Sequence, residues 1–398
     1  MNIIKRILVA NQGRDPERLK MKYDAMRSNS FIFLRGTCHL FYDRLPKDGI
    51  SKSAPRAWCC GDLHLENFGS YKGDNRLVYF DINDFDEAAL APCTWELSRI
   101  MTSILIGAKC YDISSQHAES LLTRFIDGYI SEILHGKARW VESETATGIV
   151  KDLLNSLQRR NRIEFLNART LKKGKLRKIK IDGQKALSVS EEQRINVIKF
   201  MDGFAKTQPH PAFFTVLDVA KRVAGTGSLG IDRYTILVEG KSSPDQNYLL
   251  DLKKASPSSI ASHLPSIQPE WISHADRVVN LQFRMQAVLM AFLHAVSFEK
   301  QSYVLKALQP EENRVPLINY HDDIESLDVA IGVMAQCVAW AQLRSSGRQG
   351  SANTDALIDF ARGKKWRSKI LALSHQMSQQ VQNDWETYCK AYDNKVFC

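Results

Sequence analysis

Cysteine never occurs at the spacing of a metal or redox motif. The eight cysteines include no Cys-x-x-Cys pair, and no histidine cluster stands beside them at the spacing of a zinc site. The adjacent Cys59 and Cys60 are more typical of alternating strand residues than of ligands. The sequence therefore argues against a zinc module or a disulfide-stabilised scaffold, and it favours free thiols in a reducing compartment.

Long hydrophobic runs are also missing. No apolar stretch approaches the ~20 residues needed to span a bilayer. The apolar stretch near the start is broken by Lys5 and Arg6, so it lacks the longer apolar core of a signal peptide. Repeats and low-complexity tracts are absent too. We therefore expect a cytoplasmic protein with no membrane span.

The hydrophobic content of the chain is sufficient for a large core. Of its 398 residues, 44% are hydrophobic, which suffices for one large core or two lobes. The hydrophobic pattern predicts helices toward both ends and a small antiparallel sheet between them, an α+β order instead of a repeating βαβ pattern. Helices are predicted over residues 16–45, 94–135, 274–297, 322–345 and 365–392, strands over 57–60, 77–80, 215–223, 234–239, 248–252 and 302–308, and a hairpin over 175–190, around Asp182 and Gly183.

Positive charge is concentrated in one segment. The formal net charge is +10, and ten lysines or arginines lie between Arg159 and Lys180 against one acid, Glu164. A solvated basic hairpin is the simpler interpretation, because charge runs usually form solvated faces. The alternative is a surface for an anionic partner such as nucleic acid, phospholipid or an acidic protein.

The most informative stretch, the carboxylate loop (residues 60–69), reads Cys-Gly-Asp-Leu-His-Leu-Glu-Asn-Phe-Gly. Asp62 and Asn67 lie five residues apart after a predicted strand, and Asp81 follows fourteen residues later at the end of a second one. Phosphoryl transfer needs a carboxylate that takes a proton from the acceptor hydroxyl. It also needs amide and carboxylate oxygens that hold magnesium. Capping of turns and helix starts is the simpler alternative for these acids.

This pattern resembles the catalytic loop and metal-binding aspartate of protein kinases and, more closely, of aminoglycoside and choline kinases. The resemblance implies that Asp62 is the catalytic base, that His64 braces the loop, and that Asn67 and Asp81 are metal ligands. Asp84 begins an Asp-Phe pair like that of the kinase Asp-Phe-Gly motif, so it is an alternative ligand. It lies 17 residues past Asn67, against roughly 13 in the kinase pattern, which favours Asp81.

A second motif lies far downstream. Gly225, Gly227 and Gly230 form Gly-x-Gly-x-x-Gly within the glycine loop (residues 223–230). A dinucleotide-binding fold requires a helix directly after such glycines, whereas here a strand-like run follows. This is the kinase arrangement, in which backbone N–H groups cover the nucleotide phosphates. A kinase also places a phosphate-binding lysine on the third strand, and Lys253 fits that position better than Lys254.

One kinase feature is missing. The phosphate-binding lysine of kinases pairs with a glutamate on the next helix, but the predicted helix over residues 274–297 has no glutamate in its body. Gln282 and Gln286 are the candidate substitutes. This departure keeps open a second function class, a catalytically weak nucleotide-binding module that holds an anionic partner through its basic hairpin.

Several segments together resemble an uncharacterised bacterial family, domain of unknown function 2252, over roughly residues 14–390. They are residues 30–36, 60–69, 79–88 and 95–99, with weaker support from 225–230 and 252–255. The family tends to show a His-Ala-Arg-Ser-Gly-like run near the C-terminus. In this sequence that run begins at Gln342, so any role of the histidine is absent.

The order of the motifs is the reverse of that in ordinary kinases, because the glycine loop follows the carboxylate loop. We therefore predict a two-lobed, circularly permuted kinase-like fold, which is physically tolerable where chain termini lie close together. Residues 1–200 would form the catalytic-lobe segment, 211–310 the nucleotide lobe, and 311–398 helices that pack on the catalytic lobe. The expected cofactors are ATP and magnesium, and the expected acceptor is a hydroxyl of an unidentified small molecule or protein.

Overall fold

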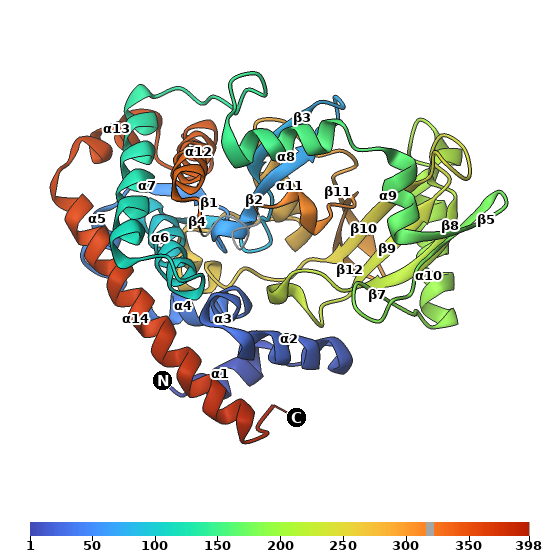
Figure 1. Cartoon of the computed structure of the whole chain (residues 1–398), viewed down its shortest axis with the longest axis horizontal. Helices are drawn as coiled ribbons and strands as arrows, with labels where there is room; N and C mark the ends of the chain where they lie inside the picture. The colour runs from blue at the N-terminus through green and yellow to red at the C-terminus, as the bar shows by residue number, and fades with distance from the viewer. Residues whose placement is uncertain (316–321, 398) are drawn as a thin grey trace.

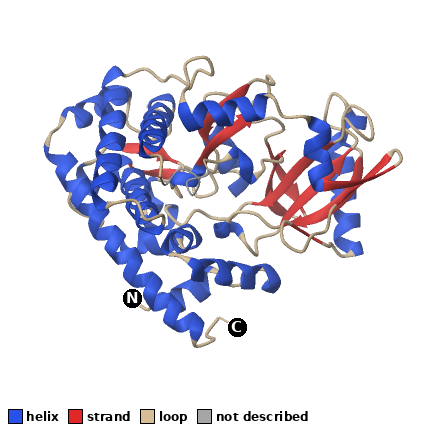
Figure 2. Cartoon of the chain, in the orientation of Figure 1, coloured by secondary structure: helices blue, strands red, loops and turns tan. Residues whose placement is uncertain are grey.

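Helices form most of one half of the molecule, and strands dominate the other (Figure 1, Figure 2). The computed structural model describes residues 1–315 and 322–397. Capping side chains mark several helix starts: Asn2 and Asp15 accept hydrogen bonds from amides in the first turns of α1 and α2, N–H groups that lack a partner within the helix. The helices are α1 (Ile3–Ala10), α2 (Pro16–Ser28), α3 (Ser30–Gly36), α4 (Cys38–Arg44), α5 (Ile50–Ser53), α6 (Cys93–Cys110), α7 (Ser115–His135), α8 (Gly148–Gln158), α9 (Arg162–Arg169), α10 (Glu191–Ala205), α11 (His274–Met285), α12 (Ile324–Arg344), α13 (Thr354–Arg362) and α14 (Lys365–Asp393).

The strands are short and antiparallel. They are β1 (Arg56–Cys59), β2 (Phe68–Lys72), β3 (Val78–Ile82), β4 (Ala89–Pro92), β5 (Thr170–Lys173), β6 (Leu176–Ile179), β7 (Ala186–Leu187), β8 (Val216–Arg222), β9 (Arg233–Val238), β10 (Tyr248–Lys254), β11 (His294–Phe298) and β12 (Gln301–Ala307). Three pairs form small ladders: β1 with β4, β2 with β3, and β5 with β6. The other six form one sheet in the order β11-β12-β10-β9-β8-β7. The protein is therefore α+β, as predicted.

The two faces of the six-stranded sheet differ in chemistry, because successive strand residues point to opposite sides. On β10, Leu250 and Leu252 belong to an apolar cluster that includes residues of α10. Asp251 and Lys253 alternate with them, and Lys253 forms an ion pair with Asp86. The charged face of the sheet is therefore the face that meets the helical half of the protein.

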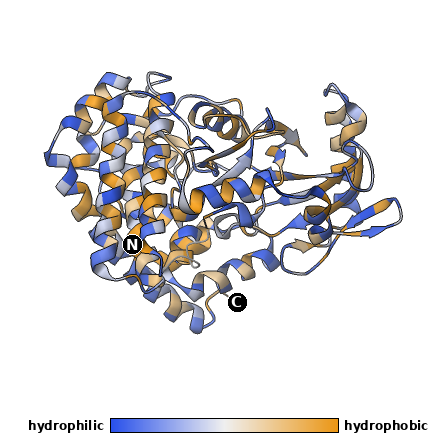
Figure 3. Cartoon of the chain, turned by 45° about the horizontal axis from the view of Figure 1, so that its top comes forward, coloured by the Kyte–Doolittle hydropathy of each residue, from blue (hydrophilic) through white to orange (hydrophobic). Residues whose placement is uncertain are grey.

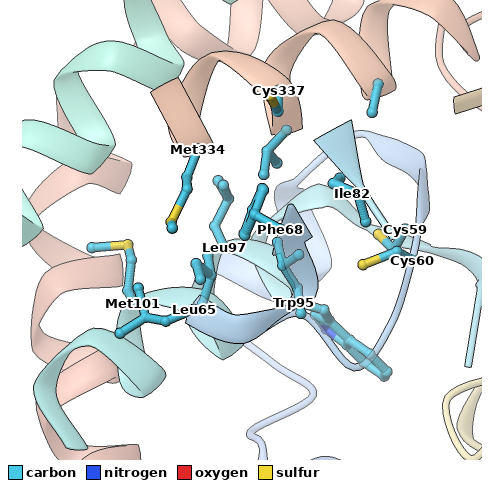
Figure 4. Close-up of a cluster of buried hydrophobic side chains, with 14 of the residues drawn as sticks. Cys59, Cys60, Leu65, Phe68, Ile82, Trp95, Leu97, Met101, Met334 and Cys337 are labelled. Atoms are coloured by element: carbon cyan, nitrogen blue, oxygen red, sulfur yellow. The ribbon is translucent and has the colours of Figure 1, made fainter. Parts of the chain in front are cut away.

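The core of the helical half lies directly under the carboxylate loop. Helix α6 is buried along nearly its whole length, and α12 and α14 pack near it, with apolar and hydrophilic residues alternating along the long helices (Figure 3). Burial of this apolar surface provides the main stabilisation of the half. The cluster in Figure 4 joins side chains from the carboxylate loop and β2 to those of α6 and α12: Leu65, Phe68, Trp95, Leu97, Met101, Met334 and Cys337.

One predicted helix is shorter than the periodicity suggested. The prediction over residues 274–297 is correct only as far as Met285, where Gln286 takes an extended conformation and ends α11. Residues His294–Phe298 form β11, an edge strand paired with β12. The apolar residues of the two elements are continuous in the sequence, so they read as one helix although the chain changes conformation between them.

The basic segment also differs from its prediction. Its hairpin joins β5 to β6 through Gly174, whose φ of 59° suits a glycine turn. The predicted turn at Asp182 and Gly183 exists, but it leads from β6 to β7, which belong to different sheets. The Asp182 carboxylate stabilises that turn by accepting three backbone N–H bonds. The helix predicted over residues 16–45 is three helices, α2 to α4.

Helix α12 is, by length and composition alone, apolar enough to cross a membrane, which the sequence analysis did not anticipate. It packs on α7 and α8, and 61% of its most apolar window is buried inside the protein. A helix that is apolar and buried on most sides is also the expected form of a central core helix.

The charged face of the sheet contains a buried ion-pair cluster. The Asp251 carboxylate, fully buried, lies 2.7 Å from the guanidinium of Arg222 and 2.6 Å from that of Arg233. These two arginines hold the pKa of Asp251 well below its usual range against the opposing effect of burial. The cluster ties the end of β8 and the start of β9 to Asp251 on β10, so it fixes both ends of the glycine loop.

Asp251→Asn is expected to lower the free energy of unfolding by about 3–5 kcal/mol, because it leaves buried guanidinium groups without a counter-charge. Asp359→Asn is the matched control, since Asp359 pairs with Arg362 on the exposed surface and should change stability by less than ~0.5 kcal/mol. Urea denaturation of both variants measures the difference. Equal small effects would show that the cluster is not what holds the strands.

Candidate functional site

The motifs identified in the sequence surround one cavity. This central cavity has a volume of about 850 Å³ and is lined by the turn before α2, the end of α3, the carboxylate loop, the acidic turn (residues 84–87), the glycine loop and the segment after β10. The elements that line it lie where the helical half meets the six-stranded sheet (Figure 1). Segments that lie far apart in the sequence, between Arg6 and Arg314, thus contribute to one site.

Strand β1 delivers the carboxylate loop to this cavity. Gly61 has a φ of 95°, and a β-carbon there would lie 2.3 Å from the Glu87 carbonyl oxygen, so only glycine fits. His64 accepts a hydrogen bond from the Glu66 amide through Nδ1 at 3.2 Å. Burial and neighbouring arginines hold the pKa of His64 well below its usual range. A neutral, buried imidazole in this position braces the loop.

Asp62 lines the cavity and is held by a buried arginine. Its Oδ1 lies 2.5 Å from Nη2 of Arg99, a residue of α6 whose side chain is fully buried. Burial raises the pKa of Asp62 to about 6, although Arg99 acts in the opposite direction. The carboxyl group is therefore ionised above about pH 6 and has a fixed orientation, as a proton acceptor requires.

Asn67 and Asp84 present oxygen atoms to the same cavity. The amide nitrogen of Asn67 donates to the Asp62 carbonyl, so its amide oxygen is the atom available to a cation. Asp84 lies in the acidic turn just past β3. Burial opposes ionisation of Asp84, but Lys253, Lys306 and Arg314 bring its pKa below the usual value.

Asp81 lies elsewhere. It is a residue of β3, its carboxylate accepts hydrogen bonds from the amides of Ile82 and Ala287 at 2.8 and 3.0 Å, and it is not among the residues that line the central cavity. The spacing argument that favoured Asp81 over Asp84 therefore does not match the geometry. The structure brings Asp84, and not Asp81, to the cavity with Asp62 and Asn67.

These oxygen atoms suit magnesium. In the described part of the chain, no three His, Cys, Asp or Glu groups gather closely enough to hold a metal by themselves. Magnesium is usually bound by only one or two carboxylates, completed by water and substrate phosphates. A set of Asp84 and the Asn67 amide oxygen fits that demand, because both line one cavity that is large enough for a phosphate chain.

The glycine loop closes over the carboxylate loop. A β-carbon at Gly227 would lie 3.9 Å from Asp62 Oδ2 and 3.2 Å from the Arg35 carbonyl oxygen. Gly225 and Gly230 have φ values of 73° and 85°, a backbone conformation that favours glycine. Arg14 fastens the loop, donating to the Gly227 and Leu229 carbonyl oxygens at 2.7 and 2.8 Å. Gly227 thus allows close approach to the carboxylate loop, and Gly230 allows close approach to Arg14.

Lys253 pairs with an acid of the helical half. Its ammonium group contacts the Asp86 carboxylate, which lines the central cavity. Lys253 itself is not among the residues that line the cavity, whereas Lys254 is. The two candidate helix partners are occupied elsewhere. Gln282 donates to Gln286 at 2.9 Å, and Gln286 donates to the Ile82 carbonyl oxygen at 2.6 Å. The partner of the lysine therefore comes from the acidic turn and not from the next helix.

A buried network under the carboxylate loop was missed by the sequence reasoning. Oε1 of Glu96 accepts the amides of Cys60 and Gly61 at 2.6 and 3.3 Å. Gln342 reaches the other Glu96 oxygen at 3.4 Å and accepts from the Tyr129 hydroxyl at 2.6 Å. The sequence contained one indication of this network: two charged residues three positions apart, Glu96 and Arg99, in the mostly apolar α6. Gln342 therefore has a structural role in this network. It stands at the position where the His-Ala-Arg-Ser-Gly-like run has histidine.

The basic segment is largely tied to the protein itself. Six of its ten cations make hydrogen bonds or ion pairs within the chain: Arg160, Arg162, Arg169, Lys172, Arg177 and Lys180. The remaining cations are on the exposed surface: Arg159, Lys173, Lys175 and Lys178. In the part of the chain that the structure describes, these four side chains, at the end of α8 and on the β5–β6 hairpin, make no hydrogen bond or ion pair within the chain.

Comparison with family models matches residues 14–391 to the family described as an uncharacterized protein conserved in bacteria, DUF2252. No curated protein and no solved structure matches the chain. The matched region contains the carboxylate loop, the acidic turn, the glycine loop and the elements that position them. Because the match covers nearly the whole chain, the protein belongs to the DUF2252 family.

Proposed function

We propose that the protein is an ATP- and magnesium-dependent phosphotransferase with a kinase-like, circularly permuted arrangement. The observation that carries this proposal is the convergence of two motifs that lie 165 positions apart in the sequence: Asp62 and Gly227 line one cavity, and a β-carbon added at Gly227 would lie 3.9 Å from Asp62 Oδ2. A proton acceptor, oxygen ligands for a cation and a glycine loop are the parts that phosphoryl transfer requires.

The chemistry assigned to each part follows from its position. Asp62 takes the proton of the acceptor hydroxyl, and the buried Arg99 keeps that carboxylate oriented. Asn67 and Asp84 would hold magnesium, which would supply positive charge to neutralise phosphate oxygens. Lys253 stabilises phosphate oxygens from the sheet side.

Basic side chains from the helical half would assist in phosphate binding. Arg14, Lys22, Arg35 and Arg314 all line the central cavity. Lys22 is nearly inaccessible and donates to the Gly227 carbonyl oxygen at 3.2 Å, so it also supports the glycine loop. A phosphate chain in this cavity would thus meet cations from both sides, which offsets the cost of removing its charge from water.

The permuted order is supported by the way the ends of the chain meet. The Tyr23 ring of α2 lies 4.8 Å from the Phe397 ring, and Arg27 forms an ion pair with Asp393 at 2.9 Å. Figure 1 shows both termini at the same side of the helical half. Chain ends that lie together are what circular permutation requires. The glycine loop between β8 and β9, with the lysine on β10, follows the kinase order within the sheet.

A second candidate function is a catalytically weak nucleotide-binding module that holds an anionic partner on the exposed hairpin lysines. The pairing of Lys253 with Asp86 favours it, because in active kinases the lysine pairs with a helix glutamate. The two candidates differ in outcome: both bind Mg-ATP, but only the phosphotransferase consumes it.

Mg-ATP is expected to raise the melting temperature of the wild-type protein by several degrees, and ATP with a chelator by less, since a ligand of the native state stabilises it. Asp84→Asn should remove the magnesium-dependent part of the shift. Asp81→Asn, the matched control, should retain it because that carboxylate lies outside the cavity. Differential scanning calorimetry measures both. If Asp81→Asn, and not Asp84→Asn, removed the magnesium-dependent shift, the metal site would be assigned to Asp81. If millimolar Mg-ATP did not change the melting temperature, nucleotide binding would be refuted.

Asp62→Asn is expected to retain Mg-ATP binding but lower ATP turnover by roughly 10²-fold or more, since a positioned base contributes about 10²–10⁴. Glu66→Gln, also next to the loop but paired with Arg35, is the control and should change turnover much less. Calorimetric binding and a coupled ADP assay provide the two readouts. Wild-type binding without measurable turnover would favour the second candidate function.

Lys253→Gln is expected to raise the Kd for Mg-ATP by roughly tenfold, the loss of one charge-assisted contact to phosphate. Lys254→Gln tests the neighbouring lysine and should have less effect if Lys253 faces the phosphates. Isothermal titration of both variants ranks them. A larger effect at Lys254 would transfer the phosphate contact to that residue.

A further inference from the structure

A second cavity, the strand-end cavity, lies at the opposite end of the sheet strands from the glycine loop. It has a volume of about 1040 Å³ and shares no lining residue with the central cavity. Gly240, just after β9, and Tyr248, at the start of β10, line it, whereas the other ends of these strands lead to the central cavity. The β2–β3 hairpin and the start of α9 complete its walls.

One wall of this cavity is aromatic. Phe213 lies 5.4 Å from Phe292 in a stacked arrangement and 4.8 Å from Tyr248, measured between ring centroids. The guanidinium of Arg162 lies 3.8 Å from the centroid of the Tyr248 ring, close enough for a cation–π contact. Flat rings that line a cavity of this size offer stacking surfaces for a planar apolar group.

Beside the aromatic wall, the lining of the cavity is positively charged. Five lysines and arginines line the cavity against one acid, Asp74. Lys72, Arg160 and Arg162 are close enough to affect one another, because burial and then these two arginines lower the pKa of Lys72. Cations that repel each other at a cavity wall are stabilised when an anion binds between them.

Two buried polar atoms on the wall have no partner among the described residues. Asn247 is fully buried, and its amide nitrogen donates to the Glu239 carbonyl oxygen and to Ser243 Oγ, both at 2.8 Å. Its side-chain oxygen accepts no hydrogen bond, and Nε2 of Gln309 donates none. Such groups normally have a partner, and leaving one unpaired costs ~1–3 kcal/mol. Both residues line the strand-end cavity.

We propose that the strand-end cavity binds a small amphipathic anion: a planar, aromatic body with one acidic head group. The aromatic wall receives the planar body, Lys72, Arg160 and Arg162 receive the acidic group, and Asn247 and Gln309 supply an acceptor and a donor for its polar substituents. The site is separate from the ATP site and does not depend on the proposed phosphotransferase activity.

The test uses two dyes with the same ring system in the full-length protein. Anilinonaphthalene sulfonate carries an anionic head, and N-phenyl-1-naphthylamine is its uncharged counterpart. Fluorescence titration should show saturable binding at one site, with a lower Kd for the anionic dye. Lys72→Gln and Arg160→Gln should each raise the Kd of the anionic dye by roughly tenfold and leave the neutral dye nearly unchanged. Lys178→Gln, an exposed cation on the hairpin, is the matched control.

A filling variant tests the position of the site. Ala291 is half-buried and lines the cavity, so Ala291→Trp should block both dyes while the Mg-ATP-dependent melting shift remains. Circular dichroism melting verifies that each variant is folded. Equal affinity for the two dyes, unsaturable binding, or binding that survives both Ala291→Trp and Lys72→Gln would overturn the proposal. If Ala291→Trp does not fold, the two charge variants decide alone.

Discussion

A buried cation needs a partner, and at the centre of this protein the partners lie far away in the sequence. Arg277 of α11 is buried and donates to the carbonyl oxygens of Asp86, Ala88 and Ser256 at 2.5 to 2.9 Å. Arg18 reaches from α2 to the Ile231 carbonyl oxygen at 2.9 Å. Because breaking such contacts leaves an uncompensated buried charge, they hold the acidic turn and the glycine loop in place. The central cavity exists because these contacts keep its walls at fixed positions.

Local patterns in the sequence were sufficient for the elements and for the motif loops. Long periodic helices such as α12 and α14, and the alternating runs of β8 to β10, were predicted because burial of one face imposes the period. Which of Asp81 and Asp84 lines the central cavity was not predictable by counting residues. Asp81 is still inside β3, where alternation sets the direction of its side chain, whereas Asp84 lies beyond the strand end and is free to turn into the cavity.

The residues that hold the site were the least predictable part. Glu96 acts through the backbone of Cys60 and Gly61, and a contact to backbone leaves no signature in the sequence of the segment it stabilises. Gln342 joins the same network from α12, more than 240 residues away. Only the packing of α6 against the carboxylate loop reveals that Glu96 positions the chain segment that carries Asp62. Asp86, the ion-pair partner of Lys253, was also not recognisable in the sequence, since the pairing crosses from the sheet to the helical half.

The two cavities share the strands of one sheet but are separated by a rigid element. Strand β10 begins with Tyr248 in the lining of the strand-end cavity and ends with Lys254 in the lining of the central one. Between them Asp251 is fixed by Arg233 at the start of the neighbouring β9 and by Arg222 at the end of β8, one strand further along the sheet. A residue clamped by two buried ion pairs does not shift in small steps, because any displacement exposes an unpaired charge to a low-dielectric interior. Coupling between the two cavities would therefore require β8, β9 and β10 to move together as one body against the helical half. Gradual deformation along β10 would not transmit it.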